Sequence, residues 1–303
     1  MSEEHESTIN TAGMSEGKAA ALEMTEASRE TEWSYATFAG QIFMGRLPWE
    51  LIYPFPEQPE KDADAGAPFF KKLNDFLESK TDPDTIDREG EIPDDVIKGL
   101  AKMGAFGIKI PKAYKGLGLS QTNYCRAAIQ LGSYCGNMTA PLSAHQSIGI
   151  PQPLIVFGTP EQKKKYLPPL MQGETWGAWG LTEAQAGSDA SGTRTTAVRE
   201  NGHYVVNGSK NFITHAITGN TCVAVAVTDK EKGNKGISAF IFDKSMEGFR
   251  SDHKENKLGM RASETASVVF EDCHVPTANL LGNEGEGFLQ AMKILDGGRI
   301  SIA

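Results

Sequence analysis

Residues 193–228 read TRTTAVRENGHYVVNGSKNFITHAITGNTCVAVAVT, and this stretch decides the fold class. It is a series of short runs rich in β-branched and aromatic residues, with Asn201-Gly202 and Asn207-Gly208 between them. Because Asn-Gly is the strongest short-range signal for a β-hairpin, both dipeptides predict tight turns between antiparallel strands. The pattern continues on both sides, and the predicted strands span 176–182, 193–199, 203–206, 209–214, 221–228, 236–243 and 266–275. Short strands with no helix between them predict an antiparallel barrel or sandwich.

The residues before this β-rich region show helical signals instead. Residues 68–79 (PFFKKLNDFLES) place their large apolar side chains on one face. Further helix starts are indicated by Pro93 with two carboxylates behind it, by Ser120 as a cap, and by Thr159-Pro160. Helical spacing returns after Gly285 and runs to the last residues. The fold class is therefore predicted to be α+β, with a helical domain before the β domain and a helix after it.

The N-terminal part of the chain differs in composition from the rest. The first 34 residues hold eight glutamates against Lys18 and Arg29, and we expect a solvated acidic tail here. The segment Phe43–Pro59 (FMGRLPWELIYPFPEQP) carries four prolines, which forbid a long helix. We predict that this segment is an arm that lies extended across another surface.

Charge and hydropathy exclude several classes of protein. The formal net charge is −9, from 30 basic and 39 acidic residues, whereas nucleic-acid binders need a basic face. The acidic N-terminus matches neither a transit peptide nor a secretory signal, and no run approaches the roughly 18 apolar residues that span a bilayer. We therefore expect a cytoplasmic protein without a transmembrane segment and without a nucleic-acid partner.

The cysteines do not predict a metal site or a disulfide framework. Cys125, Cys135, Cys222 and Cys273 form no C-x-x-C pair, so neither zinc nor disulfides are expected. Cys273 precedes His274, a pair that could suggest nucleophilic chemistry. Neighbours in a strand point to opposite faces, however, and the pair is not expected to work together.

A loop at the end of one predicted strand is the first candidate for function. Residues 181–190 (LTEAQAGSDA) pass from a strand into a turn of small and polar residues. Such residues let backbone N–H groups approach a phosphate or a flat ring closely. From the residues alone the loop is a candidate anion or cofactor site, with an ordinary strand exit as the alternative.

Six stretches, taken in order, make the chain resemble the acyl-CoA dehydrogenases over roughly residues 60–303. They are YLPPLMQGE (166–174), LTEAQAGSDASGTRTTA (181–197), YVVNGSKNFIT (204–214), NKLGMRASETASVVFEDCHVP (256–276), LLGNEGEGF (280–288) and LDGGR (295–299). The arm QIFMGRLPWELIYPFP, together with GAFGIKIPKAYKGLGLS and SAHQSIG, looks most like the very-long-chain branch of this family.

The resemblance implies a three-part architecture: a helical amino-terminal domain, an antiparallel β-barrel middle domain and a helical carboxy-terminal domain. The expected division is an acidic tail and arm at 1–59, the helical domain at 60–177, the barrel at 178–284, and the first helix of a carboxy-terminal domain at 285–303.

The resemblance also implies the chemistry. FAD would lie between the domains, and a long-chain acyl-CoA thioester would be oxidised to the trans-2-enoyl-CoA. A carboxylate removes the proton next to the carbonyl while hydride passes to the flavin. Electrons would leave through an electron-transfer flavoprotein, and the full-length protein is expected to be a homo-oligomer.

Site residues follow from the matching motifs. Flavin contacts are expected from the strand exit and from the stretch before His215, with Thr182 donating a hydrogen bond and Phe212 standing where the family more often has Trp. His215-Ala216 in place of Asn-Gly and Ala184 in place of Pro are further departures from the family pattern. The expected cofactor residues are Leu181, Thr182, Gly187, Ser188, Phe212 and Thr214, and the expected substrate residues are Ser188, His145, Gln146, Asp296 and Arg299.

The catalytic base is expected beyond Ala303. In a minority branch of the family the base immediately precedes the arginine that matches Arg299, but here that residue is Gly298. Glu183 lies beside the flavin loop and is assigned to the structure of the loop. This chain alone would then be nearly inactive, because a positioned base contributes about 10²–10⁴-fold. The alternatives are a non-catalytic module that needs a partner chain, or a relative of the acyl-CoA oxidases or nitroalkane oxidases.

Overall fold

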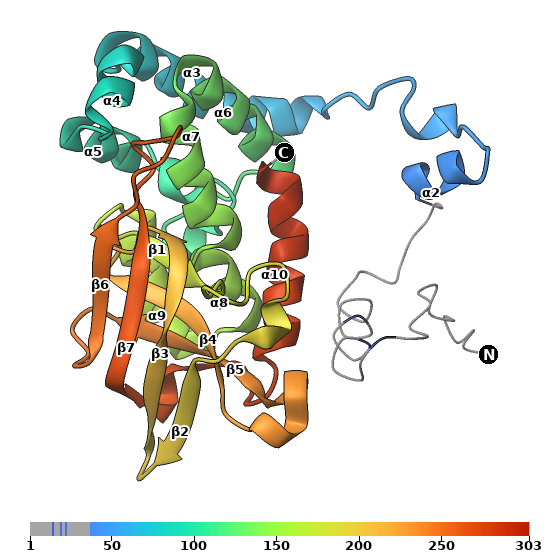
Figure 1. Ribbon diagram of the computed structural model, residues 1–303. Helices are drawn as coiled ribbons and strands as arrows, with labels where there is room; N and C mark the ends of the chain where they lie inside the picture. The colour runs from blue at the N-terminus through green and yellow to red at the C-terminus, as the bar shows by residue number, and fades with distance from the viewer. Residues whose placement is uncertain (1–13, 15–18, 20–21, 23–36, 303) are drawn as a thin grey trace.

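The computed structural model describes residues 37–302 and, ahead of them, residues 14, 19 and 22. Apart from these three residues, the acidic tail predicted at 1–34 lies outside the described part of the chain. Figure 1 shows a helical layer, a β-sheet below it, and the red helix α10 running from the sheet up to the helices. None of the helices in the described part is long and apolar enough to cross a bilayer.

The helices form where the sequence supplies caps. Ser120 accepts a hydrogen bond from the Asn123 backbone N–H at 3.1 Å and starts α6. Thr159 and Gln162 form a reciprocal capping box at the start of α9. The helices and helical turns of this layer are α3 (Glu60–Lys80), α4 (Pro83–Glu89), α5 (Asp94–Lys102), η2 (Ala105–Gly107), η3 (Lys112–Tyr114), α6 (Gln121–Tyr134), α7 (Gly136–Ser143), η4 (Ala144–Ile148), α8 (Pro151–Phe157) and α9 (Pro160–Met171).

The Gln162 side chain also joins the helical layer to the sheet. Its Oε1 accepts from the Thr159 N–H at 3.0 Å, while its Nε2 donates to the carbonyls of Ala278 and Leu280, each at 2.9 Å. One buried amide therefore serves the start of α9 and the segment that leads into the last strand.

The arm is not one extended strand. The short helix α2 (Phe38–Phe43) leads into the arm and the 3₁₀ turn η1 (Trp49–Leu51) lies within it, and neither of them buries a residue. Figure 1 shows this blue segment projecting away from the rest of the molecule. The Gln58 side chain, which bonds Asn123 and Arg126, marks where the chain joins the helical layer. Within the described part of the chain, the arm therefore does not pack on another surface as predicted, and the large apolar side chains of the arm are exposed.

The β region is one mixed sheet whose strands hydrogen-bond in the order β6-β7-β3-β2-β4-β5-β8, with β1 on β4. The predicted barrel is wrong in one respect, because the sheet does not close. The prediction of purely antiparallel pairing also fails at two places, since β1 and β2 each meet β4 in parallel. The strands are β1 (Gly177–Gly180), β2 (Thr196–Glu200), β3 (His203–Thr214), β4 (Thr221–Val227), β5 (Ile237–Asp243), β6 (Phe249–Lys254), β7 (Thr265–Pro276) and β8 (Leu280–Leu281).

Only one of the two Asn-Gly dipeptides makes the predicted hairpin turn. Asn201-Gly202 joins β2 to β3, and Glu200 pairs with His203 across the turn. Asn207-Gly208 lies inside β3 at a register shift opposite β7. A Cβ on Gly208 would lie 2.5 Å from the Thr195 hydroxyl, so the close approach of that neighbour requires glycine here.

The two faces of the sheet belong to different apolar cores. One face packs Tyr204, Phe240, Phe242 and Phe270 together. The opposite face, through residues such as Val223 and Ile241, packs against α8, α9 and α10 (Gly287–Ile302). Because α10 crosses the second core, its inner face reaches the end of β1.

Candidate functional site

A cavity of about 150 Å³ lies where β1 ends, between the sheet, η4 and α10. One wall is the exit of β1 at Leu181 and Thr182, and the other is the end of β3 at Phe212, Ile213 and Thr214. The full lining is Ala144, Ile148, Gly177, Trp179, Leu181, Thr182, Phe212, Ile213, Thr214 and Leu295. Four of the six predicted cofactor residues, Leu181, Thr182, Phe212 and Thr214, therefore meet at one cavity although they lie about 30 positions apart in the sequence.

The two walls are tied together by their backbones. The Asn211 N–H donates to the Thr182 carbonyl at 2.8 Å. This bond replaces the pairing that Asn211 would make in a regular ladder, since β3 carries one residue more than β7 between Lys210 and Ile213. The extra residue forms a β-bulge, a feature that redirects side chains next to active sites.

Phe212 lies in this bulge with a φ of 59°, which is the left-handed region. A bulky residue rarely adopts this conformation, which costs about 1–3 kcal/mol and persists only where the surroundings enforce it. The bulge turns the Phe212 ring outward, so that it lines the cavity and remains 63% exposed. The sequence predicted an aromatic wall here but not the strained backbone that presents it.

Trp179 is a lining residue that the sequence reasoning missed. It lies in β1 and is 9% exposed, and its indole Nε1 is buried without a hydrogen-bond partner among the described residues. The available signal was strand alternation, because residues two apart in a strand share a face and Leu181 had been assigned to the site. Ala144, Ile148 and Leu295 were missed as well, since they come from elements far away in the sequence.

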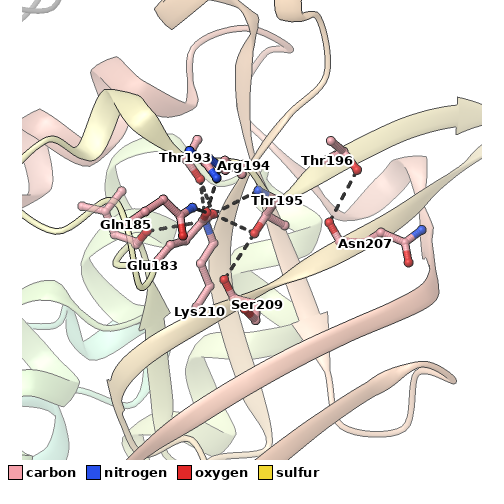
Figure 2. A network of polar contacts seen from close by, with 10 residues as sticks. Glu183, Gln185, Thr193, Arg194, Thr195, Thr196, Asn207, Ser209 and Lys210 are labelled. Atoms are coloured by element: carbon pink, nitrogen blue, oxygen red, sulfur yellow. Dashed lines mark hydrogen bonds and ion pairs between the residues drawn. The ribbon is translucent and has the colours of Figure 1, made fainter.

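A buried polar network lies beneath the wall formed by Leu181 and Thr182 (Figure 2). At its centre the Glu183 carboxylate, 4% exposed, is 2.7 Å from the Nζ of Lys210, a side chain with no exposed surface. Lys210 also donates to the Thr193 hydroxyl at 2.9 Å. The other donors to Glu183 are the side chains of Gln185, Thr193 and Thr195 and the backbone N–H groups of Arg194 and Thr195.

These contacts decide the protonation state of Glu183. Burial opposes its ionisation, but the charge of Lys210 and the hydrogen bonds from Lys210, Thr193 and Arg194 outweigh burial and lower its pKa to about 2. A carboxylate held in this way has no free lone pair directed at the cavity. The geometry agrees with the assignment of Glu183 to loop structure and not to proton abstraction.

Gly187 and Ser188 lie on the exposed turn beyond the network and do not line the cavity. A Cβ on Gly187 would come within 3.9 Å of the Thr182 methyl group, which places the turn beside that wall. Their predicted contacts, to a cofactor and to a CoA arm, stay predictions.

His145 and Gln146 belong to η4, a turn of π-helix, and both side chains are buried away from the cavity. Gln146 accepts from the Ile108 N–H at 2.8 Å and donates to the Ala105 carbonyl at 2.7 Å, which occupies its amide with the backbone of η2. The Gly177 N–H donates to His145 Nδ1 at 3.1 Å, while burial and then the neighbouring His215 lower the pKa of His145 to about 3. Both residues support the structure around β1, and their neighbours Ala144 and Ile148 reach the cavity.

Asp296 and Arg299 lie one turn apart on α10 with exposed side chains, 3.9 Å from each other. Leu295 of the same helix lines the cavity. The predicted substrate residues are thus next to the cavity along the helix but outside its lining.

His215 follows the second wall and is also buried. Its Nε2 donates to the Pro141 carbonyl at 3.0 Å, and its ring stacks on Trp176 with centroids 4.3 Å apart. Burial lowers the pKa of His215 to about 4, so the ring is neutral at neutral pH. These residues line a second cavity of about 310 Å³ that also involves Glu264, which accepts the N–H groups of Ile217 and Thr218.

The cysteine predictions can be checked in the same region. Cys273 is fully buried in β7 and His274 is exposed, so the two point to opposite faces as expected. Burial raises the pKa of Cys222 to about 12 and that of Cys273 to about 11. Both thiols are therefore unreactive side chains of the sheet.

Comparison with known proteins identifies two domains. Residues 68–174 match the family model "Acyl-CoA dehydrogenase, N-terminal domain", and residues 178–273 match "Acyl-CoA dehydrogenase, middle domain". A relative from Clostridium acetobutylicum named "Acyl-CoA dehydrogenase, short-chain specific" is 46% identical over 233 residues, which cover 76% of this chain and 61% of that protein. The chain therefore spans about three fifths of the length of this curated relative.

Solved structures agree in fold. Butyryl-CoA dehydrogenase from Megasphaera elsdenii matches with a TM-score of 0.75 and 40% identity, over 79% of this chain and 64% of that one. A chain from a structure titled "Electron transferring flavoprotein of Acidaminococcus fermentans" matches with a TM-score of 0.76 and 42% identity, over 81% and 64%. An acyl-CoA dehydrogenase from Bacillus anthracis complexed with FAD matches with a TM-score of 0.67 and 32% identity, over 81% and 41%.

Proposed function

The chain belongs to the acyl-CoA dehydrogenase family, whose N-terminal and middle domains it contains, and from this premise we propose that it takes part in the FAD-dependent oxidation of an acyl-CoA thioester. The observation that carries the proposal is the cavity between the β1 exit and the β3 bulge. A flat aromatic cofactor fits these walls, because a bulky ring at Phe212 stands exposed on one side and two threonines line the cavity. The buried indole N–H of Trp179, which has no hydrogen-bond partner among the residues that the structure describes, is a further donor at this place.

The residues that line the cavity would hold the cofactor through hydroxyl groups and apolar contacts. Thr182 and Thr214 would supply hydroxyl groups from the two walls, while Leu181 and Phe212 would contact the faces of the ring. Ile148, Ala144 and Leu295 present an apolar side that excludes water from the reacting bond. Bound FAD would supply the acceptor for a hydride from the β-carbon of the substrate.

Among the described residues that line the cavity, none carries a carboxylate or an imidazole. We assign binding and orientation to these side chains, not proton abstraction. Glu183 contributes indirectly by holding the β1 exit in place, as its full set of donors indicates.

The sequence motifs and the compared proteins point to different lengths of the acyl chain. The motifs of the arm resemble the very-long-chain branch, whereas the compared proteins are named for short-chain and butyryl-CoA substrates. We propose an acyl-CoA thioester as the substrate class, with butyryl-CoA, octanoyl-CoA and palmitoyl-CoA as the series that separates the two predictions.

We propose an electron-transfer flavoprotein as the electron acceptor. A chain with the same fold occurs in a structure titled for an electron-transferring flavoprotein. The Phe212 ring, which lines the cavity and is exposed, offers a contact for a redox partner next to the cofactor.

The test is an anaerobic titration. The chain is first saturated with FAD, which is followed by the loss of free-flavin fluorescence, and each acyl-CoA is then added while the flavin absorbance near 450 nm is recorded. Bleaching by one of the three thioesters, with this chain alone or after a co-purifying helical chain that supplies the base is added, supports the proposal and gives the preferred chain length. Absence of FAD binding would refute it, and bleaching that is reversed by oxygen with stoichiometric oxygen consumption would instead indicate an acyl-CoA oxidase. Binding of FAD without bleaching, restored by a co-purifying helical chain, would identify a module that needs a partner.

A further inference from the structure

The Glu183–Lys210 pair lies at the point where the two walls of the cavity meet. Glu183 follows Thr182 directly, and Lys210 precedes the bulge that presents Phe212. The pair therefore connects, through one 2.7 Å contact, the two segments whose spacing sets the width of the cavity.

The Lys210 side chain packs tightly against the end of β1. A Cβ on Gly180 would lie 3.3 Å from the Lys210 Cγ and 2.8 Å from the Ala224 Cβ. The lysine stem thus passes beneath the last residue of β1 with no space for a side chain there. Its ammonium group then reaches Glu183 and Thr193 on the far side.

The bulge itself requires outside support. Phe212 has no intrinsic preference for a φ of 59°, and strain of this kind persists only where surrounding contacts enforce it. The segment before Phe212 is tied to the β1 exit by the Asn211 N–H, which donates to the Thr182 carbonyl, and by Lys210, which bonds Glu183 and, at 3.5 Å, the Leu181 carbonyl. Both end on the same wall.

We propose that Glu183 and Lys210 are positioning residues that hold the Phe212 bulge against the β1 exit and so fix the geometry of the flavin cavity. The inference rests on the proposed function for the identity of the ligand. A buried ion pair is weak evidence for stability alone, because desolvation of both charges offsets their attraction. Its use here is to fix the register of two segments that the hydrogen-bond ladder leaves irregular.

The experiment separates positioning from stability. Lys210→Met leaves the Glu183 carboxylate buried without its cation, and this variant is expected to lose stability. The double variant Lys210→Met/Glu183→Gln removes both charges, and the Gln oxygen can still accept from the Thr195 N–H, whereas the Arg194 N–H, which bonds the other carboxylate oxygen, loses its acceptor. A merely structural role predicts that the double variant recovers thermal stability and FAD affinity together. The positioning role predicts recovered stability with FAD binding still roughly tenfold weaker, the loss that one misplaced hydrogen bond produces.

A second measurement needs no cofactor. Hydrogen–deuterium exchange of the apo chain is followed in peptides covering 209–214, where the Asn211 amide is held by Thr182. Faster exchange is expected in both variants that carry Lys210→Met, because Met keeps the apolar stem but loses the charge. The matched control is Arg250→Met, which removes the exposed 3.0 Å ion pair to Glu271 on the same sheet and should change neither readout.

Each outcome decides the inference. Wild-type FAD affinity in the double variant, or unchanged exchange at 209–214, would overturn it. If the wild-type chain binds no FAD, the proposed function fails, while the exchange result still decides whether the pair holds the bulge.

Discussion

Two adjacent glycines on α10 allow a sharp test of the packing around the cavity. Gly298 is buried, and a Cβ added there would lie 2.4 Å from the Ile148 Cγ2, far inside the ordinary contact range of 3.4–4 Å. Gly297 is exposed, and a Cβ there would have no atom within 4 Å. The same substitution, glycine to alanine, is therefore expected to have opposite effects at neighbouring positions.

The magnitudes follow from two opposing contributions. Alanine is favoured over glycine in a helix interior by about 1 kcal/mol, and this gain applies to both positions. At Gly298 the extra methyl group must displace Ile148, whose branched Cβ restricts rotation, and overpacking of this kind costs about 1–3 kcal/mol. We expect Gly297→Ala to stabilise by about 1 kcal/mol and Gly298→Ala to be neutral or destabilising by up to about 2 kcal/mol.

The assay combines thermal unfolding with FAD titration. A difference of 1 kcal/mol shifts the Tm by about 2–4 °C in a chain of this size class, so the two variants should be clearly separated. Ile148 lines the cavity, and its displacement in Gly298→Ala should also weaken FAD binding, whereas Gly297→Ala should leave the affinity unchanged. Equal Tm values for the two variants, or a stabilised Gly298→Ala, would refute the reasoning.

Three further predictions concern other parts of the structure. The pKa of Glu183 falls from its ordinary 4.5 to about 2 on folding, so its contribution of roughly 3 kcal/mol to the free energy of unfolding is present above pH 4.5 and lost as the pH falls toward 2. Chemical denaturation between pH 2 and 5 should therefore show a steeper loss of stability in the wild type than in Glu183→Gln. Equal slopes would contradict this. Cys222 and Cys273 should resist a thiol reagent at pH 8 until the protein is denatured, whereas the half-buried Cys125 should react in the native state. Rapid labelling of three or more thiols in the native protein would contradict the burial of these two cysteines. Thr182→Val keeps the shape but removes the hydroxyl, so FAD should bind about tenfold more weakly at unchanged Tm; unchanged affinity would remove Thr182 from the cofactor contacts.

Local signals in the sequence were reliable where the physics is local. Ser120 and Thr159-Pro160 start helices as predicted, because a cap depends only on residues within one turn. Asn201-Gly202 makes its hairpin for the same reason. The opposite orientation of Cys273 and His274 follows from strand alternation alone.

Features set by distant partners could not be read in this way. Asn207-Gly208 carries the same local signal as a hairpin turn, but the Asp272 backbone of β7 bonds Asn207 and keeps the strand continuous. Closure of a sheet depends on how its edge strands pair, and β1 is a four-residue strand that finds a parallel partner far along the chain.

The sequence predicted the two strand walls of the candidate site, but not the lining residues that come from η4 and α10. Leu181, Thr182, Phe212 and Thr214 were named from motifs, and the structure brings them to one cavity. The sides supplied by η4 and α10 depend on packing between elements. The π-helical turn illustrates this, since it turns His145 and Gln146 inward and leaves Ile148 at the cavity.

The side-chain amide of Gln162 couples the unfolding of the helical layer to that of the sheet. The oxygen of this side chain completes the first turn of α9 and its nitrogen holds the segment leading into β8, so release of that segment leaves a buried N–H group without its two acceptors. Unfolding at either place therefore destabilises the other.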